Sequence, residues 1–172
     1  MARRRGRSII ARDVLLADHV GARLHVCHVS TAGSVEVIRW AKSRGIDVTA
    51  EVTPHHLALT EDLIAGHDGA PGYDARYKVN PPLRAREDVE ALRAALADGT
   101  IDIVATDHAP HTAEAKCCEW PAAANGMVGL ESALSVVQSA VVDDGRLDWA
   151  DVARVLSEAP ARIGQVEGHG QR

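Results

Sequence analysis

Three short apolar segments alternate with segments of helical periodicity, and this alternation is the feature that most constrains the fold. The expected strands are residues 23–29, 46–52 and 101–106. Strands that alternate with helices of about 10 to 15 residues predict right-handed βαβ units and a parallel sheet. The sequence therefore predicts an α/β protein.

The expected helices each carry one apolar stripe. They cover residues 8–20, 34–44 and 84–97, a segment that includes 130–141, and 148–156. Apolar residues three or four positions apart mark the buried side of a helix. Those expected to face inward are Ile10, Val14, Ala17, Val35, Ile38, Trp40, Ala41, Val89, Leu92, Leu96, Leu130, Leu134, Val137 and Val141. Between the second strand and the third long helix lies a long loop, Thr53–Pro82, with one expected helical turn at Glu61–Ala65.

Composition excludes several classes of protein. The net charge is −5, from 19 basic and 24 acidic residues, whereas a nucleic-acid binder usually carries a basic face. No run approaches the roughly 18 apolar residues of a membrane helix. The 3 cysteines are a poor disulfide framework and fit a reducing compartment. We therefore expect a cytoplasmic protein with no nucleic-acid or membrane partner.

Residues able to bind metal or move protons stand at the end of each expected strand. His28 ends the first strand, His55 and His56 follow the second, and Asp107 ends the third. In parallel α/β proteins the ligand lies at the carboxyl ends of the strands. Imidazole and carboxylate together suit Zn²⁺ or a related divalent ion. This pattern predicts a metal site at that edge of the sheet.

Each of these residues also has a structural interpretation. The alternation of side chains along a strand separates His28 from His25 and Cys27, so His28 is the better candidate ligand. A buried histidine bonded to a backbone carbonyl is the alternative for His28, and a small core residue is the expectation for Cys27. Asp107 is either a metal-bound carboxylate that can take a proton or a helix N-cap.

The remaining polar positions are less specific. Two prolines after Asn80 fix an extended backbone, so its amide is held near the strand ends, or it is simply a turn residue before a helix. His55 and His56 are expected in a capping or hydrogen-bonding role rather than as direct ligands. Cys117 and Cys118 lie in a loop and are expected to be incidental thiols.

Five motifs in order resemble the later motifs of bacterial type I dihydroorotases, zinc enzymes of the amidohydrolase superfamily. They are LHVCHVST (24–31), EVTPHHL (51–57), KVNPPLR (78–84), TDHAPH (106–111) and GMVGLE (126–131). The resemblance covers almost the whole chain apart from the first few and last dozen residues.

The resemblance implies a partial (β/α)₈ TIM barrel comprising the last three strands with their helices. It implies a zinc hydrolase that interconverts N-carbamoyl-L-aspartate and L-dihydroorotate in pyrimidine biosynthesis. His28 matches a ligand of the second zinc, and Asp107 matches the aspartate that binds the first zinc and acts as general base. The positions that match substrate-contacting residues are Asn80, His111, Asn125 and Gly126.

The chain also departs from the family pattern. Ala124 and Asn125 stand before Gly126 where the family usually has Pro-Phe, and the segment Gly66–Tyr77 is longer and richer in glycine. The first-strand His-x-His-x-Arg motif, the bridging carboxylate and the earlier histidine ligand are absent. We therefore expect residues 1–172 to be the carboxyl-terminal part of a barrel domain, with a basic chain end at 1–7 and a polar tail at 160–172. Such a chain should by itself bind zinc weakly and show no ring-opening activity.

Three functional interpretations follow. The first is the carboxyl-terminal part of a dihydroorotase acting on a small molecule, completed by another barrel fragment. The second is a related cyclic amidohydrolase of the hydantoinase or allantoinase type, which usually differs around Asn80 and His111. The third is a non-catalytic subunit that supports aspartate transcarbamoylase, which the retention of His28 and Asp107 argues against.

Overall fold

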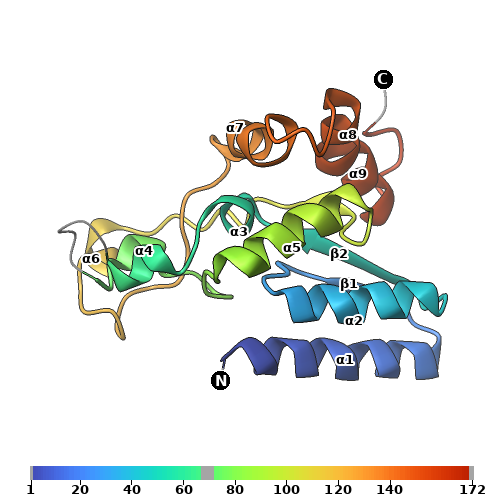
Figure 1. The fold of residues 1–172 in the computed structure, drawn as a ribbon, viewed down its shortest axis with the longest axis horizontal. Helices are drawn as coiled ribbons and strands as arrows, with labels where there is room; N and C mark the ends of the chain where they lie inside the picture. Colours follow the sequence, from blue (N-terminus) through green and yellow to red (C-terminus); the bar gives the residue numbers. More distant parts are fainter. Residues whose placement is uncertain (1, 67–71, 171–172) are drawn as a thin grey trace.

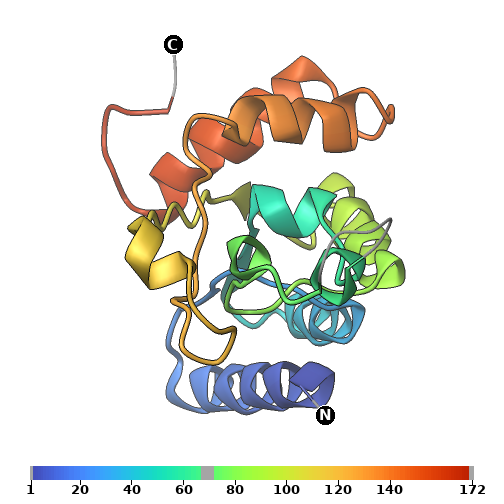
Figure 2. The same ribbon diagram turned by 90° about the vertical axis from the view of Figure 1, so that its left-hand side faces the viewer.

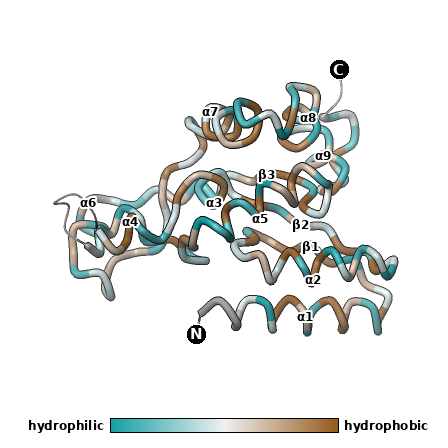
Figure 3. Tube along the Cα trace, viewed as in Figure 1, coloured by the Kyte–Doolittle hydropathy of each residue, from teal (hydrophilic) through white to brown (hydrophobic). Residues whose placement is uncertain are grey.

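A three-stranded parallel sheet lies at the centre of the computed structural model, which describes residues 2–66 and 72–170. Its strands are β1 (Leu24–Val26), β2 (Val48–Val52) and β3 (Ile103–Val104), in the spatial order β1-β2-β3. Figure 1 labels β1 and β2, and Figure 3 labels all three strands. In the register of the two pairs, His25 lies opposite Thr49, and Glu51 lies opposite Ile103. The α/β expectation is confirmed, although each strand is shorter than its apolar segment.

Helices connect and follow the strands. The α-helices are α1 (Ala2–Val20), α2 (Ala32–Ser43), α3 (Pro54–Ala58), α4 (Asp62–Ala65), α5 (Arg86–Ala97), α6 (Ala113–Lys116), α7 (Ala133–Val137), α8 (Trp149–Ala153) and α9 (Ala159–Ile163). A 3₁₀ turn, η1 (Ala75–Tyr77), and two π-helical segments, η2 (Gln138–Val142) and η3 (Arg154–Glu158), complete the described structure. No helix in the described ranges is both long enough and apolar enough to cross a membrane.

The helices pack beside one another in chain order. Helix α1 contacts α2, α2 contacts α5, and α5 contacts η2, while η3 packs against β3. Figure 2 shows this row rising from α1 (blue) to the carboxyl-terminal helices (orange to red). A row of helices that follows the strand order is the arrangement of one sector of a barrel wall.

One hydrophobic core holds the sheet and the long helices together. Ile38 of α2, Leu92 and Leu96 of α5, and Val52 of β2 are at most 1% exposed. Figure 3 shows the hydrophobic segments (brown) recurring along α1, α2 and α5. The expected inward residues of these helices are largely confirmed, because all but Ile10 and Trp40 are buried.

Three residues expected in the core are instead exposed. Trp40 is 45% exposed, Leu130 is 63% exposed and Leu134 is 53% exposed. Trp40 lies two residues after the buried Ile38, and a rotation of about 200° turns it away from the core. Leu130 precedes α7, so helical periodicity does not apply to it, and Ala133 takes the buried position next to Leu134.

Several boundaries also differ from expectation. Helix α1 already begins at Ala2, so the basic chain end is largely helical, and α9 extends into the expected polar tail. The loops after β2 and β3 contain the short helices α3 and α6, which lack long apolar stripes. Part of the glycine-rich segment, residues 67–71, lies outside the described residues.

Candidate functional site

The two faces of the sheet differ in chemistry. Val26, Val48, Ala50 and Val52 form an apolar face that is buried against the helices. The alternate residues His25, Thr49 and Glu51 form a polar face. On it, the His25 ring lies between its neighbours, with Nδ1 2.8 Å from Thr49 Oγ1 and Nε2 3.0 Å from Glu51 Oε2.

The two predicted zinc ligands share an uncommon backbone conformation at the ends of the outer strands. His28 follows β1 with a φ of 38°, and Asp107 follows β3 with a φ of 48°. Residues other than glycine rarely adopt positive φ, and such strain concentrates at functional sites. Asp107 is not an N-cap, because the next helix, α6, begins at Ala113 and is capped by Thr112.

Glu51 joins the polar face to the end of β1. Its Oε1 accepts a hydrogen bond from the backbone N–H of His28, at 3.3 Å, while Oε2 contacts His25. Cys27, between them, is exposed, so its expected place in the core is wrong. Partial burial, followed by the charges of Glu51 and Asp107, raises the pKa of the Cys27 thiol. Asp107 therefore lies close enough to Cys27 for its charge to affect the ionisation of the thiol.

His56 fastens the loop that carries Asn80 to the end of β2. Thr53 caps α3, and its hydroxyl lies 2.7 Å from His56 Nδ1, while His56 Nε2 donates to the carbonyl of Pro81 at 3.0 Å. Burial lowers the pKa of His56 to about 3, so the ring is neutral. The expected hydrogen-bonding role of His56 is confirmed.

His55 differs from His56. Its Nε2 is buried and has no hydrogen-bond partner among the described residues. Burial lowers the pKa of His55 to about 4, with Asp107 opposing the shift and His28 adding to it. His55 is therefore a neutral imidazole near both predicted ligands. A buried ring nitrogen without a partner can bind a metal ion or a hydrogen-bond donor of a substrate. Together with the His28 imidazole and the Asp107 carboxylate, it gives this end of the sheet the kinds of donor that zinc binds.

Three of the predicted substrate-contacting residues lie together. His111 Nε2 donates to the carbonyl of Asn125 at 2.8 Å, and the Gly126 N–H donates to the carbonyl of Lys78 at 2.9 Å. Gly126 has a φ of 134°, and a Cβ there would stand 2.7 Å from that of Ala109. Only glycine fits this close approach. Asn80 is exposed two residues after Lys78.

Two lysines that the sequence analysis did not single out organise this loop cluster. Lys78 Nζ donates to the carbonyl of Ala123, and Lys116 Nζ donates to those of Ala75 and Ala124. Lysines that bond backbone carbonyls leave no periodic signal in a sequence, so only the structure identifies them. Cys117 and Cys118, beside this cluster, are exposed free thiols.

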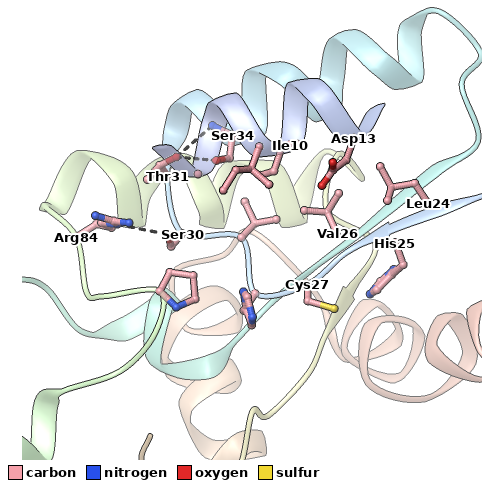
Figure 4. Close-up of a pocket in the computed structure, with 15 residues that line it drawn as sticks. Ile10, Asp13, Leu24, His25, Val26, Cys27, Ser30, Thr31, Ser34 and Arg84 are labelled. Atoms are coloured by element: carbon pink, nitrogen blue, oxygen red, sulfur yellow. Dashed lines mark hydrogen bonds between the residues drawn. The ribbon is translucent and has the colours of Figure 1, made fainter. Parts of the chain in front are cut away.

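A cavity of about 390 Å³ borders the end of β1 (Figure 4). It is lined by residues of α1, by β1 with the chain that follows it, and by Pro81 and Arg84. Arg84 closes one side, where its Nε donates to Ser30 Oγ at 3.3 Å. His28 lines the cavity, whereas Asp107 and His111 do not. The cavity therefore lies next to His28, a predicted zinc ligand, and next to Pro81, which follows Asn80.

The fold resembles solved cyclic amidohydrolases. A dihydropyrimidinase from Brevibacillus agri superposes with a TM-score of 0.87 at 26% sequence identity, covering 96% of this chain and 36% of the other. An L-hydantoinase from Arthrobacter aurescens gives 0.84 at 35% identity, with the same coverage. These proteins are barrels of the metal-dependent hydrolase type, and the partial-barrel expectation is confirmed.

Sequence comparison finds relatives at higher identity than the solved structures. No family model matches the chain. Dihydroorotases match it over 95% of its length, with 80% identity in Leifsonia xyli, 70% in Streptomyces coelicolor and 55% in Mycobacterium tuberculosis. The chain is therefore similar to dihydroorotases over nearly its whole length, as its motifs indicated. It spans 36 to 37% of the length of these three relatives.

Proposed function

We propose that this chain forms the carboxyl-terminal part of a dihydroorotase, which interconverts N-carbamoyl-L-aspartate and L-dihydroorotate in pyrimidine biosynthesis. The observation that carries the proposal is the pair His28 and Asp107, both held in a left-handed backbone conformation at the strand ends of a chain with dihydroorotase relatives. In this family these positions match zinc ligands.

The side chains at this edge have complementary roles in the proposed reaction. His28 and Asp107 would hold zinc, which supplies a Lewis acid and an acidified water when bound. The Asp107 carboxylate accepts the proton of the water that attacks the ring amide and delivers it to the leaving ring nitrogen. His55 stays neutral at physiological pH because its pKa is about 4.

The loop cluster would bind the substrate beside this centre. The imidazole of His111 and the backbone at Asn125 and Gly126 are held together by the hydrogen bonds of the cluster. The exposed Asn80 amide can both donate and accept a hydrogen bond. These groups suit the carboxylate and amide groups of a dihydroorotate ring.

We further propose that the chain requires the remainder of the barrel for turnover. A complete barrel of this type needs about 250 residues. The family's other metal ligands lie in motifs that this sequence does not contain. The expected partner is therefore a complementary barrel fragment, covalently joined or separate.

A chimera tests the proposed activity. This chain would replace the segment that it matches in the Leifsonia dihydroorotase, whose remainder supplies the other strands. We expect the chimera to open L-dihydroorotate and to close N-carbamoyl-L-aspartate at rates close to those of the recipient enzyme. A folded, zinc-loaded chimera without either activity would contradict the proposal.

A hydantoinase or dihydropyrimidinase activity is the second candidate, favoured by the solved structures that share the fold. The same chimera distinguishes the two when it is offered L-dihydroorotate, hydantoin and dihydrouracil in parallel. The dihydroorotase proposal predicts turnover of L-dihydroorotate alone. Faster turnover of hydantoin or dihydrouracil would favour the second candidate.

A further inference from the structure

His108 contacts a part of the chain that lies far from it in the sequence. Its Nδ1 atom accepts hydrogen bonds from the backbone N–H groups of Gly129, at 3.1 Å, and Leu130, at 3.0 Å. His108 directly follows Asp107, the proposed general base, and precedes His111, a proposed substrate contact. The proposed reaction gives His108 no task of its own, although it lies between two residues that take part in that reaction.

His108 and its neighbour Ala109 pair with residues 126–130. Met127 forms an isolated parallel bridge with His108, and the carbonyl of Met127 accepts the N–H of Ala109 at 3.0 Å. This backbone pairing fastens the first half of the segment, and the two bonds to His108 Nδ1 fasten its second half. The His108 side chain therefore continues a contact that the backbone begins.

The start of this segment is where a displacement would matter most for the proposed substrate contacts. A Cβ at Gly126 would stand 2.7 Å from the Cβ of Ala109 and 3.0 Å from His111 Nε2. The residue before it, Asn125, accepts the hydrogen bond of His111 through its carbonyl. The contacts proposed for these residues thus depend on how residues 126–130 lie against the chain that follows β3. Misplacing a positioning group by about 1 Å can cost on the order of a hundredfold in rate.

We propose that His108 is a positioning residue for substrate binding. Through an unprotonated Nδ1 it holds residues 126–130 in place, so that Asn125 and Gly126 stay beside His111. His108 acts through this backbone segment and not on the substrate itself. The inference rests on the proposed dihydroorotase function, because the contacts that it protects are those of the proposed substrate.

The two hydrogen bonds also fix the tautomer of the His108 ring. A ring nitrogen that accepts a hydrogen bond carries no proton, so the neutral ring has its proton on Nε2. His108 is exposed, so hydrogen bonding rather than burial sets the orientation of the ring. What the segment requires from this position is therefore an acceptor at the place of Nδ1.

Two amide side chains in the chimera test this requirement, because they place an acceptor differently. The oxygen of Asn is attached to Cγ, as Nδ1 of histidine is, whereas the oxygen of Gln is one bond further out. We expect His108→Asn to keep KM for L-dihydroorotate within about threefold of the unchanged chimera. His108→Gln and His108→Ala should raise KM about tenfold or more, the worth of two hydrogen bonds, with kcat within about threefold. His19→Ala, at an exposed position of α1, is the matched control and should change neither constant.

A merely structural role for His108 would give a different pattern. All three variants at His108 would then lower the midpoint of thermal unfolding and leave KM unchanged. That result, or equal KM values in His108→Asn and His108→Gln, would overturn the proposal.

A nitrogen NMR spectrum of the 172-residue chain, labelled with ¹⁵N-histidine, tests the hydrogen bonds without measuring activity. The spectrum of His108→Asn identifies the His108 signals by their absence. Near neutral pH we expect an unprotonated Nδ1 and a protonated Nε2. A proton on Nδ1 would overturn this inference alone. A folded, zinc-loaded chimera that does not open L-dihydroorotate would overturn the proposed function and, with it, the role of His108 in that reaction.

Discussion

The apolar and polar faces of β1 and β2 belong to the same two strands but have opposite roles. The apolar face (Val26, Val48, Ala50 and Val52) is buried by the helices. The polar face (His25, Thr49 and Glu51) is joined by side-chain hydrogen bonds and remains partly accessible. Parallel strands usually read as continuous hydrophobic runs because both faces are covered. Polar residues at alternate positions of β1 and β2 therefore indicate a functional site. We expect substitutions on the apolar face to change stability and substitutions at the polar strand ends to change activity.

The largest expected effect lies at the proposed catalytic residue, Asp107. Asp107→Ala in the chimera should lower kcat by about 10²- to 10⁴-fold, the range typical of a lost general base. If the loss of this carboxylate also releases the zinc ion, no turnover should be detected. Steady-state kinetics at saturating L-dihydroorotate measure it. Asp18→Ala, on the exposed side of α1, is the matched control and should leave kcat unchanged. Near-normal kcat in Asp107→Ala would show that another group is the base.

The core beneath the apolar face should govern stability. Leu96→Ala removes a side chain that is 0% exposed and should lower the free energy of unfolding by about 2 to 5 kcal/mol. Leu130→Ala, at a position that is 63% exposed, should change it by less than about 0.5 kcal/mol. Urea denaturation of the chain checks both values. Equal losses in the two variants would mean that the core does not lie where the structure places it.

The buried histidines should make stability fall in mild acid. The folded-state pKa values of His55 and His56, about 4 and about 3, lie below the ordinary 6.5, so the unfolded chain takes up protons first as the pH falls. Their contribution is complete well above pH 6.5 and is lost as the pH falls through the folded-state pKa values, with about 1.5 kcal/mol lost per histidine between pH 6.5 and pH 5.

Replacing one of these histidines checks the acid effect. His55→Gln should flatten the dependence of the unfolding free energy on pH, whereas His19→Gln, at an exposed position of α1, should not. Urea denaturation between pH 5 and pH 8 gives the slopes. An unchanged slope in His55→Gln would mean that the ring is protonated alike in both states.

The smallest expected effect is at the loop that we propose binds the substrate. Asn80→Ala in the chimera should raise KM by roughly 3- to 10-fold, the worth of one hydrogen bond, with little change in kcat. Because the Asn80 side chain is exposed, its replacement should not disturb the fold, and a change in KM can be assigned to substrate binding. Asn125→Ala is the matched comparison and should have less effect, because the contact proposed there is through the backbone. A fall in kcat alone for Asn80→Ala would place the residue in the chemical step.

The sequence predicted those parts of the fold that periodicity controls. The alternation of strands and helices and the inward residues Val14, Ile38, Leu92 and Leu96 follow from repeating apolar positions, and all four are buried. Periodicity says little at helix ends and in loops. For that reason the exposure of Leu130 and the short helices α3 and α6 were not foreseen, whereas the expected turn at Glu61–Ala65 is confirmed by α4.

The site was predicted in part. Strand ends mark His28 and Asp107 in any parallel sheet, but their positive φ values are a property of the folded backbone. The role of Glu51 depends on the register between β1 and β2, which brings it beside His25 and the His28 N–H. Register and side-chain hydrogen bonds across strands are set by tertiary packing, so the sequence pattern alone left Glu51 without a role.

The central claim is that this chain carries one part of a dihydroorotase site and that the rest of the barrel completes it. The most direct measurement is the rate of L-dihydroorotate ring opening at saturating zinc, made on the 172-residue chain alone and on the chimera in parallel. We predict no measurable turnover by the chain alone and turnover by the chimera that is lost with Asp107→Ala. Turnover by the purified chain alone, or an active chimera that does not need Asp107, would contradict the account.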